Sequence, residues 1–331
     1  MTEEVWHGGD LGAARALFPG APEPWIDLST GINPCPYPLP ALPLSLWQTL
    51  PSAREEEGLL AAARKAYRVP PGMGIVAAPG TQILIELLPR LFAAEGVAVL
   101  GPTYAEHALA WGKAGHRVQP IETTAFDPDA SSLVLVNPNN PDGRVVPQPD
   151  LERLAAGCRD RGGILVVDEA FADFTPEISI VPTLPPATIV LRSFGKTYGL
   201  AGLRVGFAIG EPHHVQALRE ALGPWAVAGP ALRVAATALS DESWLAQAAR
   251  ARQADAKRLD GLLAPRGRVL GGSDLFRLLE TQAAAALFDH LGKAGIYVRR
   301  FQDAPNRLRF GLPADEQAWA RLAIALESAF R

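Results

Sequence analysis

Short apolar runs alternate with segments of helical pattern between residues 75 and 209. The runs are rich in β-branched residues and have the length of strands, so we expect strands at 75–78, 97–100, 117–121, 133–136, 164–167, 188–191 and 205–209. Strands that are apolar throughout are buried on both faces, and intervening helices allow them to run parallel. The alternation therefore predicts an α/β fold, with a mostly parallel seven-stranded sheet at the centre of a three-layer αβα domain.

The first part of the chain has a different pattern. Residues 1–51 are rich in proline and show little periodicity, which predicts an extended arm that covers a pocket or packs on the surface. Residues 54–67, 81–93 and 212–263 have helical patterns, the last broken at Gly223-Pro224 and Gly229-Pro230.

The last part of the chain predicts a smaller α+β domain. Strand patterns occur at 269–270, 275–279, 296–299 and 307–310, and helical patterns at 282–294 and 314–330. We expect the large domain to span residues 45–222. Residues 1–44 and 223–331 are then expected to form the N-terminal arm and the small domain.

Composition and charge exclude several classes of function. The 331 residues are 48% hydrophobic, enough for a large core, and the net charge of −4 predicts no nucleic-acid-binding surface. No apolar run is long enough for a membrane span, and the acidic N-terminus lacks the apolar core of a signal peptide. Cys35 and Cys158 form no disulfide framework, so we expect reduced thiols in a cytoplasmic protein.

A glycine-rich loop with a single lysine, Lys196, lies between the last two strands expected in the large domain. Burying a lysine charge costs on the order of several kcal/mol. Lys196 is therefore either a loop residue with its ammonium group in water, or an amine that forms a Schiff base with a carbonyl. Ser193 and Arg204 flank it, and a hydroxyl with a guanidinium can bind phosphate oxygens. An aldehyde and a phosphate on one ligand indicate pyridoxal 5′-phosphate (PLP).

Two polar clusters follow expected strands, where ligands bind in parallel sheets. Gly80, Thr81 and Gln82 open a helix whose N–H groups can bind phosphate, although Thr81 could equally be an ordinary N-cap. Tyr104 could stack on a flat ring or lie in the core.

Asn140 and Asp168 follow two further expected strands. The Asn140 amide could donate to a phenolic oxygen, although the surrounding Asn-Pro turn needs no ligand. Asp168 would be partly buried and needs a partner, which could be a protonated pyridine nitrogen, a metal ion or a helix N-terminus. Because no histidine or cysteine cluster accompanies it, we expect no metal. A pyridine partner would stay cationic and could accept electrons.

Three arginines of the predicted small domain are candidates for an anionic substrate. They are Arg299, Arg300 and Arg309, and each could instead be a solvated arginine at a sheet edge.

In combination and in this order, these residues resemble the fold-type-I PLP-dependent enzymes, the aspartate aminotransferase superfamily, over nearly the whole chain. The motifs are Gly80-Thr81, Asn140-Pro141-Asp142-Gly143, Asp168, Lys196, Arg204 and Leu308-Arg309-Phe310. The resemblance implies that Lys196 bonds to the cofactor and moves protons, and that Asp168 and Asn140 bind the ring nitrogen and ring oxygen. It also implies that Tyr104 stacks on the ring and that Arg309 binds an acidic group of the substrate. The cofactor phosphate is then expected to contact Gly80, Thr81, Ser193 and Arg204, and Gln82 is expected to bind the cofactor.

Within the superfamily the chain is most similar to two sister families, the histidinol-phosphate aminotransferases and the threonine-phosphate decarboxylases of cobalamin synthesis. His7-Gly8-Gly9-Asp10 and the stretches 27–34, 101–107 and 223–227 favour the decarboxylases. The resemblance implies a homodimer that converts L-threonine O-3-phosphate, a small phosphorylated amino acid, to (R)-1-amino-2-propanol O-2-phosphate. Substrate anions are expected to bind His7, Gly9, Asn33, Arg299 and Arg309.

Two positions depart from the family pattern, and two other functions stay open. Phe171 stands where many relatives have a tyrosine that donates to the ring oxygen, and Leu50 stands where many have a tyrosine that reaches the neighbouring subunit's cofactor phosphate. The alternatives are a histidinol-phosphate-type aminotransferase and a protein that binds PLP without turnover and acts as a regulator or partner protein. Decarboxylation rather than transamination requires the bond between the substrate Cα and its carboxylate to stand perpendicular to the cofactor ring.

Overall fold

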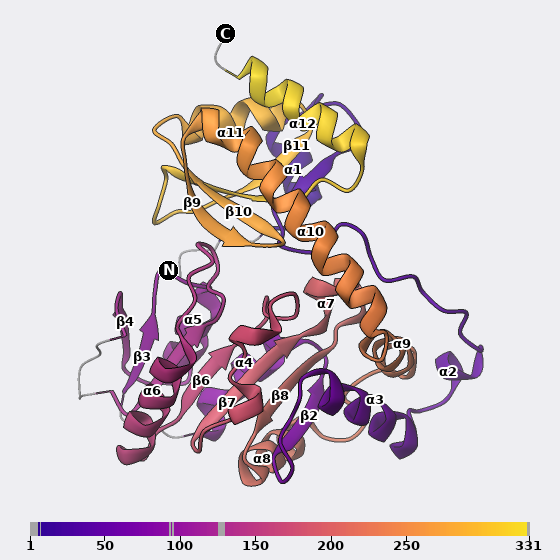
Figure 1. Ribbon diagram of the computed structural model, residues 1–331, viewed down its shortest axis with the longest axis vertical. Coiled ribbons are helices and arrows are strands. Elements are labelled where there is room, and N and C mark those ends of the chain that lie inside the picture. The colour runs from indigo at the N-terminus through magenta and orange to yellow at the C-terminus, as the bar shows by residue number, and fades with distance from the viewer. Residues whose placement is uncertain (1–5, 7, 93, 95, 125–129, 330–331) are drawn as a thin grey trace. The chain divides into compact units, whose positions relative to one another are not determined.

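The structure is a computed structural model that describes all residues except 1–5, 7, 93, 95, 125–129 and 330–331 (Figure 1). The chain divides into two compact units. The larger unit contains residues 36–140 and 144–247, and the smaller contains 1–35, 141–143 and 248–331. The expected domain limits at 45 and 222 both lie inside the larger unit, because α9 (Gly229–Leu239) packs against α3 (Ala53–Ala66).

The larger unit is built on a seven-stranded sheet. Its strands, in spatial order, are β2 (Gly74–Ala78), β8 (Gly206–Gly210), β7 (Thr188–Ser193), β6 (Leu165–Asp168), β5 (Ser132–Val136), β3 (Val97–Leu100) and β4 (Val118–Ile121). Strand β8 is antiparallel to both of its neighbours, and the other pairs are parallel. Each strand expected between residues 75 and 209 corresponds to one of these, so the predicted sheet is confirmed.

Helices cover both faces of this sheet, as the apolar strands require (Figure 1). On one face Ile75 and Leu133 pack with residues of α3, α6 (Gln148–Asp160) and α9. On the other face the next residues, Val76 and Val134, pack with α4 (Thr81–Leu91), α5 (Ala105–Lys113) and α8 (Pro212–Leu222). The predicted three-layer αβα fold is therefore confirmed. Short helices α2 (Ser45–Gln48) and α7 (Phe194–Thr197) and 3₁₀ turns at Pro176–Ile178, Val181–Thr183 and Ala201–Leu203 complete the unit.

The smaller unit has a five-stranded sheet. Its order is β1 (Ile26–Leu28), β11 (Ile296–Arg300), β12 (Arg307–Gly311), β10 (Phe276–Glu280) and β9 (Arg268–Ser273). The helices are α1 (Leu11–Leu17), α11 (Ala284–Lys293), α12 (Glu316–Ser328) and, from residue 248, α10 (Glu242–Leu263), which a 3₁₀ turn at Ala264–Arg266 follows. Among the described residues, no helix combines the length and the apolar character needed to cross a membrane.

Strand β1 belongs to the segment that we expected to be an extended arm. It runs parallel to β11 and pairs Ile26 with Ile296 and Leu28 with Val298. Ile26 and Leu28 are buried in the core of the smaller unit, and Asp27 between them is partly exposed. The arm is therefore extended at this point, but as an edge strand of a sheet.

A buried ion-pair network joins the segment after β6 to the end of β7. Arg192 pairs with Glu169 and Asp173, and its guanidinium carbon lies 4.5 Å from the centre of the Tyr67 ring. Ser179 Oγ donates to Glu169 at 2.6 Å, and the backbone N–H of Ile180 donates at 2.9 Å. Because side chains alternate along a strand, this network lies on the α3 face, opposite to Asp168 and Ser193. It therefore fixes two strand ends that carry predicted site residues.

Replacing Arg192 by Met should reveal how much this network stabilises the fold. Burial already raises the pKa of Glu169, with Arg192 opposing the shift. Without Arg192, two buried carboxylates lack their cation, and we expect a loss of about 3–5 kcal/mol in the free energy of unfolding at neutral pH. A carboxyl group with a raised pKa in the folded state favours folding at low pH, so the loss should be smaller at about pH 5 than at about pH 8. Urea unfolding followed by circular dichroism measures both values.

The control for this variant is Arg153→Met. Arg153 pairs with Asp150 at 2.9 Å, but both side chains are largely exposed. Its loss should cost less than about 1 kcal/mol. Equal losses for the two variants, or a larger loss for Arg192→Met at low pH, would contradict the assignment.

Candidate active site

The predicted cofactor residues lie at one edge of the seven-stranded sheet. Strands β2, β3, β5, β6 and β7 run in the same direction and end at this edge, and the antiparallel β8 begins there. The strand ends, loops and helix starts at this edge carry Gly80, Thr81, Gln82, Tyr104, Asn140, Asp168, Ser193, Lys196 and Arg204. The topology thus brings together residues that are far apart in the sequence.

The start of α4 lies beside the Arg204 side chain. Gly80 has φ +84°, and a Cβ atom on it would lie 2.5 Å from Arg204 Nη2. Gly80 occupies the cap position and no side chain caps the helix, so Thr81 is not the ordinary N-cap that was the alternative. Gly206 completes the packing, because a Cβ atom there would lie 2.6 Å from the Thr81 backbone nitrogen. Helix N–H groups beside a guanidinium can bind a phosphate.

Tyr104 is held in place by Gln82. The Tyr104 hydroxyl donates to Gln82 Oε1 at 3.1 Å, and Gln82 Nε2 donates to Glu106 at 3.1 Å. Tyr104 is partly exposed at the N-terminus of α5 and also packs against the apolar core on that face of the sheet. Its ring can present a face to a planar ligand.

Asp168 is a buried carboxylate with two partners. It is 4% exposed, its Oδ2 lies 2.9 Å from His107 Nε2, and its Oδ1 accepts from the Ala170 backbone N–H at 3.0 Å. These contacts hold the carboxylate in one orientation. Among the described residues, one group could supply three metal ligands. It consists of Glu211, His213 and His214 and does not include Asp168.

His107 is a site residue to which the sequence analysis gave no role. It is 1% exposed and lies three residues after Tyr104, with ring centres 6.1 Å apart. Residues spaced by three share one side of a helix. This spacing was the signal in the sequence, but the contact with Asp168 required the packing of α5 on the sheet.

Lys196 lies in α7, between two aromatic residues that pack against each other. The rings of Phe194 and Tyr198 stack with centres 4.5 Å apart, and Tyr198 stacks on Trp244 at 5.4 Å. This column fixes the turn that carries the lysine. Lys196 is partly buried, and its Nζ lies 5.7 Å from the centre of the Phe171 ring. An apolar ring therefore lies near the amine.

The turn that carries Asn140 is fixed by the preceding residue. Asn139 Oδ1 accepts from Thr103 Oγ1 at 2.6 Å, and Asn139 Nδ2 donates to the Pro102 carbonyl at 2.9 Å. Both polar atoms of the Asn139 side chain are thus hydrogen-bonded to the loop after β3. The partly exposed Asn140 remains the better candidate for contact with a ligand.

The donor set at this edge fits PLP. It contains a cradle for a phosphate at Gly80 and Arg204, a buried carboxylate at Asp168, a tyrosine ring at Tyr104 and an amine at Lys196. Each of these groups matches one part of the cofactor, namely its phosphate, ring nitrogen, ring face and aldehyde.

The predicted substrate residues of the smaller unit gather around residues 27–33. The Gly9 backbone N–H donates to Ser29 Oγ at 2.7 Å, and Arg309 Nη2 donates to the Ser29 carbonyl at 2.9 Å. Arg299 is the partner of Arg309 in the β11–β12 register. His7 lies outside the described residues.

Arg309 is buried near a like charge. It is 7% exposed, and burial together with the Arg299 guanidinium lowers the pKa of Arg309 to about 9, with Asp27 opposing. The group stays cationic at neutral pH, and a pair of neighbouring guanidinium groups favours an anion. By contrast, the Arg300 guanidinium carbon lies 4.1 Å from the Trp6 ring centre and 4.4 Å from that of Phe288, so Arg300 has a packing role.

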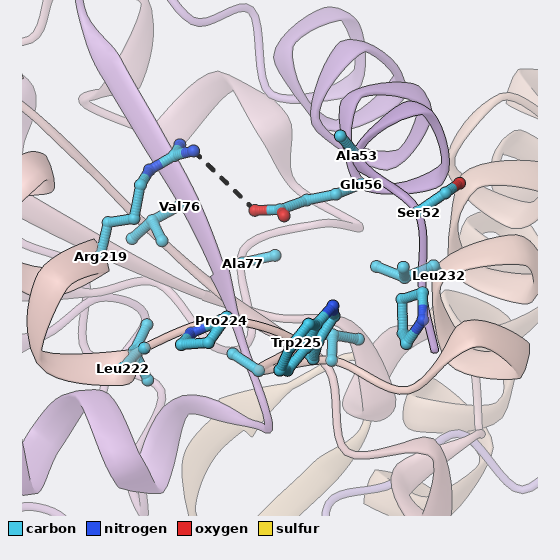
Figure 2. A pocket seen from close by; sticks show the side chains of 14 residues that line it. Ser52, Ala53, Glu56, Val76, Ala77, Arg219, Leu222, Pro224, Trp225 and Leu232 are labelled. Atoms are coloured by element: carbon cyan, nitrogen blue, oxygen red, sulfur yellow. Dashed lines mark ion pairs between the residues drawn. The ribbon is translucent and has the colours of Figure 1, made fainter. Parts of the chain in front are cut away.

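A pocket of about 190 Å³ lies between the start of α3 and the segment 222–227, above β2 (Figure 2). Glu56 and Arg219 pair across it at 3.9 Å, and Trp225 lines it although 58% of that residue is exposed. None of the predicted site residues lines this pocket.

Comparison with known proteins gives matches over nearly the whole chain. The threonine-phosphate decarboxylase of Pseudomonas aeruginosa is 46% identical over 325 residues, which are 97% of this chain and 96% of that protein. A threonine-phosphate decarboxylase of Sinorhizobium sp is 41% identical over 332 residues, 98% of each. The solved structure of histidinol-phosphate aminotransferase from Sinorhizobium meliloti in complex with PLP has a TM-score of 0.79 at 22% identity. It covers 96% of this chain and 94% of that one, and this likeness concerns the fold. Residues 48–326 match the family of class I and II aminotransferases. The chain therefore belongs to the class I and II aminotransferase family.

Proposed function

We propose that the protein is a PLP-dependent threonine-phosphate decarboxylase of cobalamin biosynthesis. It would convert L-threonine O-3-phosphate to CO₂ and (R)-1-amino-2-propanol O-2-phosphate. The observation that carries the proposal is the 46% identity, over 97% of the chain, to a protein of that activity. The donor set at the edge of the large sheet supports the PLP dependence in this proposal, because each group matches a part of PLP.

The residues of the larger unit would hold the cofactor and handle its proton. When bound, PLP supplies an electron-accepting ring for the bond that breaks at the substrate Cα. Asp168, oriented by His107, would pair with the ring nitrogen. Gly80, Thr81, Ser193 and Arg204 would bind the phosphate, and Asn140 the ring oxygen. The Lys196 amine would bond to the aldehyde in the absence of substrate. Once the substrate amine has displaced it, the Lys196 amine would return a proton to Cα.

The residues of the smaller unit would bind the two anionic groups of the substrate. We propose Arg299 and Arg309 as the cations, with Asn33, Gly9 and His7 as further donors. Binding energy obtained from the phosphate leaves the carboxylate unclamped, so that its bond to Cα can stand perpendicular to the ring. A clamped carboxylate would favour the alternative reaction, transamination.

We also propose that the protein is a homodimer that works in the cytoplasm. Large apolar side chains are exposed on the larger unit at Leu39, Leu44, Trp47, Leu50 and Trp225. Trp225 borders the pocket of Figure 2, and Leu50 immediately precedes Pro51 on its wall. Exposed apolar residues gathered on one segment are typical of interfaces. Both cysteines are free, as expected in a reducing compartment, and cell fractionation followed by activity assay tests the location.

The purified protein with PLP should release CO₂ from L-threonine O-3-phosphate and form one equivalent of phosphorylated aminopropanol. Product analysis by mass spectrometry measures both. Formation of glutamate and the corresponding phosphorylated ketone from histidinol phosphate and 2-oxoglutarate, without CO₂ from threonine phosphate, would favour the aminotransferase. PLP binding with neither reaction would favour a regulatory protein.

Replacing Trp47 by Lys should weaken the proposed dimer. Trp47 is 65% exposed, and a charge at the centre of an apolar interface is expected to raise the dimer dissociation constant at least about tenfold. Analytical ultracentrifugation measures the change. The control is Ile324→Lys on α12 in the smaller unit. Ile324 is 66% exposed, so this variant introduces the same charge at a similarly exposed apolar residue outside the proposed interface. A monomeric wild type, or equal effects of the two variants, would contradict the proposed interface.

A further inference from the structure

Arg252 is a buried arginine on α10 that contacts a predicted substrate residue. It is 8% exposed, and its Nη1 donates to Asn33 Oδ1 at 3.1 Å. Asp255, three residues later on the same helix, pairs with its Nη2. Asn33 itself is 2% exposed. The Arg252 charge is thus balanced within its own helix, while one of its donors is directed at a neutral side chain.

Two donors fix the orientation of the Asn33 amide. Its Oδ1 accepts two hydrogen bonds, from Arg252 Nη1 and from the Cys35 backbone N–H at 3.0 Å. Rotating the amide by half a turn would place its NH₂ group against both donors, which loses two buried hydrogen bonds and sets donor against donor. The oxygen therefore faces Arg252, and the NH₂ group faces away from it.

Asn33 lies in the segment 27–33, to which Arg309 is hydrogen-bonded. Arg309 donates to the Ser29 carbonyl, and Ser29 Oγ accepts from the Gly9 backbone N–H. Ser29 in turn donates its backbone N–H and hydroxyl to Asp27, at 2.9 and 2.5 Å. Segment 27–33 is therefore hydrogen-bonded to two other predicted substrate residues, Gly9 and Arg309.

We propose that Arg252 is a positioning residue, which turns the Asn33 amide so that its NH₂ group donates to the anionic group of the substrate. The proposal rests on the proposed function, because Asn33 is a substrate residue only in that context. Arg252 would then add a specificity element to those already proposed for the smaller unit. An anion needs donors, and an Asn33 amide in the opposite orientation would present an oxygen that repels it.

The test is a double-mutant cycle on the PLP-loaded enzyme with Arg252→Met and Asn33→Ala. Arg252→Met should raise the KM for L-threonine O-3-phosphate about tenfold, as the loss of a fixed charge-assisted contact predicts. It should change kcat less than about twofold and leave the visible absorbance of bound PLP unchanged. In the Asn33→Ala background the same replacement should have no further effect on KM, because the two residues act through one contact. Additive effects, or a fall in kcat at unchanged KM, would overturn the proposal.

Two controls separate positioning from folding. Arg258→Met removes an arginine of the same helix that pairs with Glu316 at the surface, and it should leave KM unchanged. Arg252→Gln keeps an NH₂ donor and should recover part of the affinity. If Arg252→Met does not fold, Arg252→Gln replaces it in the comparison of KM values. Thermal unfolding shows whether each variant is folded.

Calorimetric titration of the PLP-loaded enzyme with inorganic phosphate distinguishes this proposal from the proposed function. If the wild type releases no CO₂ but binds phosphate, and Arg252→Met weakens binding only when Asn33 is present, the decarboxylase proposal fails and the positioning role stands. If CO₂ is released while KM and phosphate affinity are the same in Arg252→Met, the positioning role fails. A wild type that binds no phosphate and has no KM for threonine phosphate overturns both.

Discussion

The buried carboxylate of Asp168 is the constraint on which the rest of the candidate site depends. An acidic residue at the end of an apolar strand is tolerated only with partners, and here His107 and the Ala170 N–H supply them. On the opposite face of the same strand end, Glu169 is matched by Arg192 and Ser179. Two adjacent buried acids thus bind partners on both faces of the sheet. This arrangement fixes the strand ends from which the loops of Asn140, Asp168 and Lys196 emerge.

The two units carry different parts of the proposed chemistry. The larger unit holds the groups that match PLP, and the smaller unit holds the cations and amides suited to a substrate with two anionic groups. This division explains how a chain of an aminotransferase family can be proposed as a decarboxylase. The cofactor residues are common to both reactions, whereas the choice of reaction depends on how the substrate carboxylate is oriented. Residues such as Asn33, Arg299 and Arg309 are therefore where specificity is to be sought.

How much the sequence predicts depends on how local the pattern is. The strands of the large sheet were predicted because a continuous apolar run is a local signal of a buried strand. Strand β1 was described only as extended, because it has three residues and pairs with β11 some 270 positions later. His107 received no role because its contact depends on the packing of α5 against β6. Arg252 resembled any solvated arginine on a helix, and its contact with Asn33 spans 219 positions. Contacts of this kind follow from tertiary packing, which spacing along the chain does not encode.

Borohydride reduction of the PLP-loaded protein, followed by peptide mass mapping, tests the central claim most directly. Reduction makes the bond between the cofactor aldehyde and its amine permanent, so the modified lysine can be identified. The structure predicts a phosphopyridoxyl group on the peptide that contains Lys196, and none on Lys65, Lys113, Lys257 or Lys293. Modification of any of those four lysines with Lys196 unmodified would contradict the assignment of the site to this edge of the sheet.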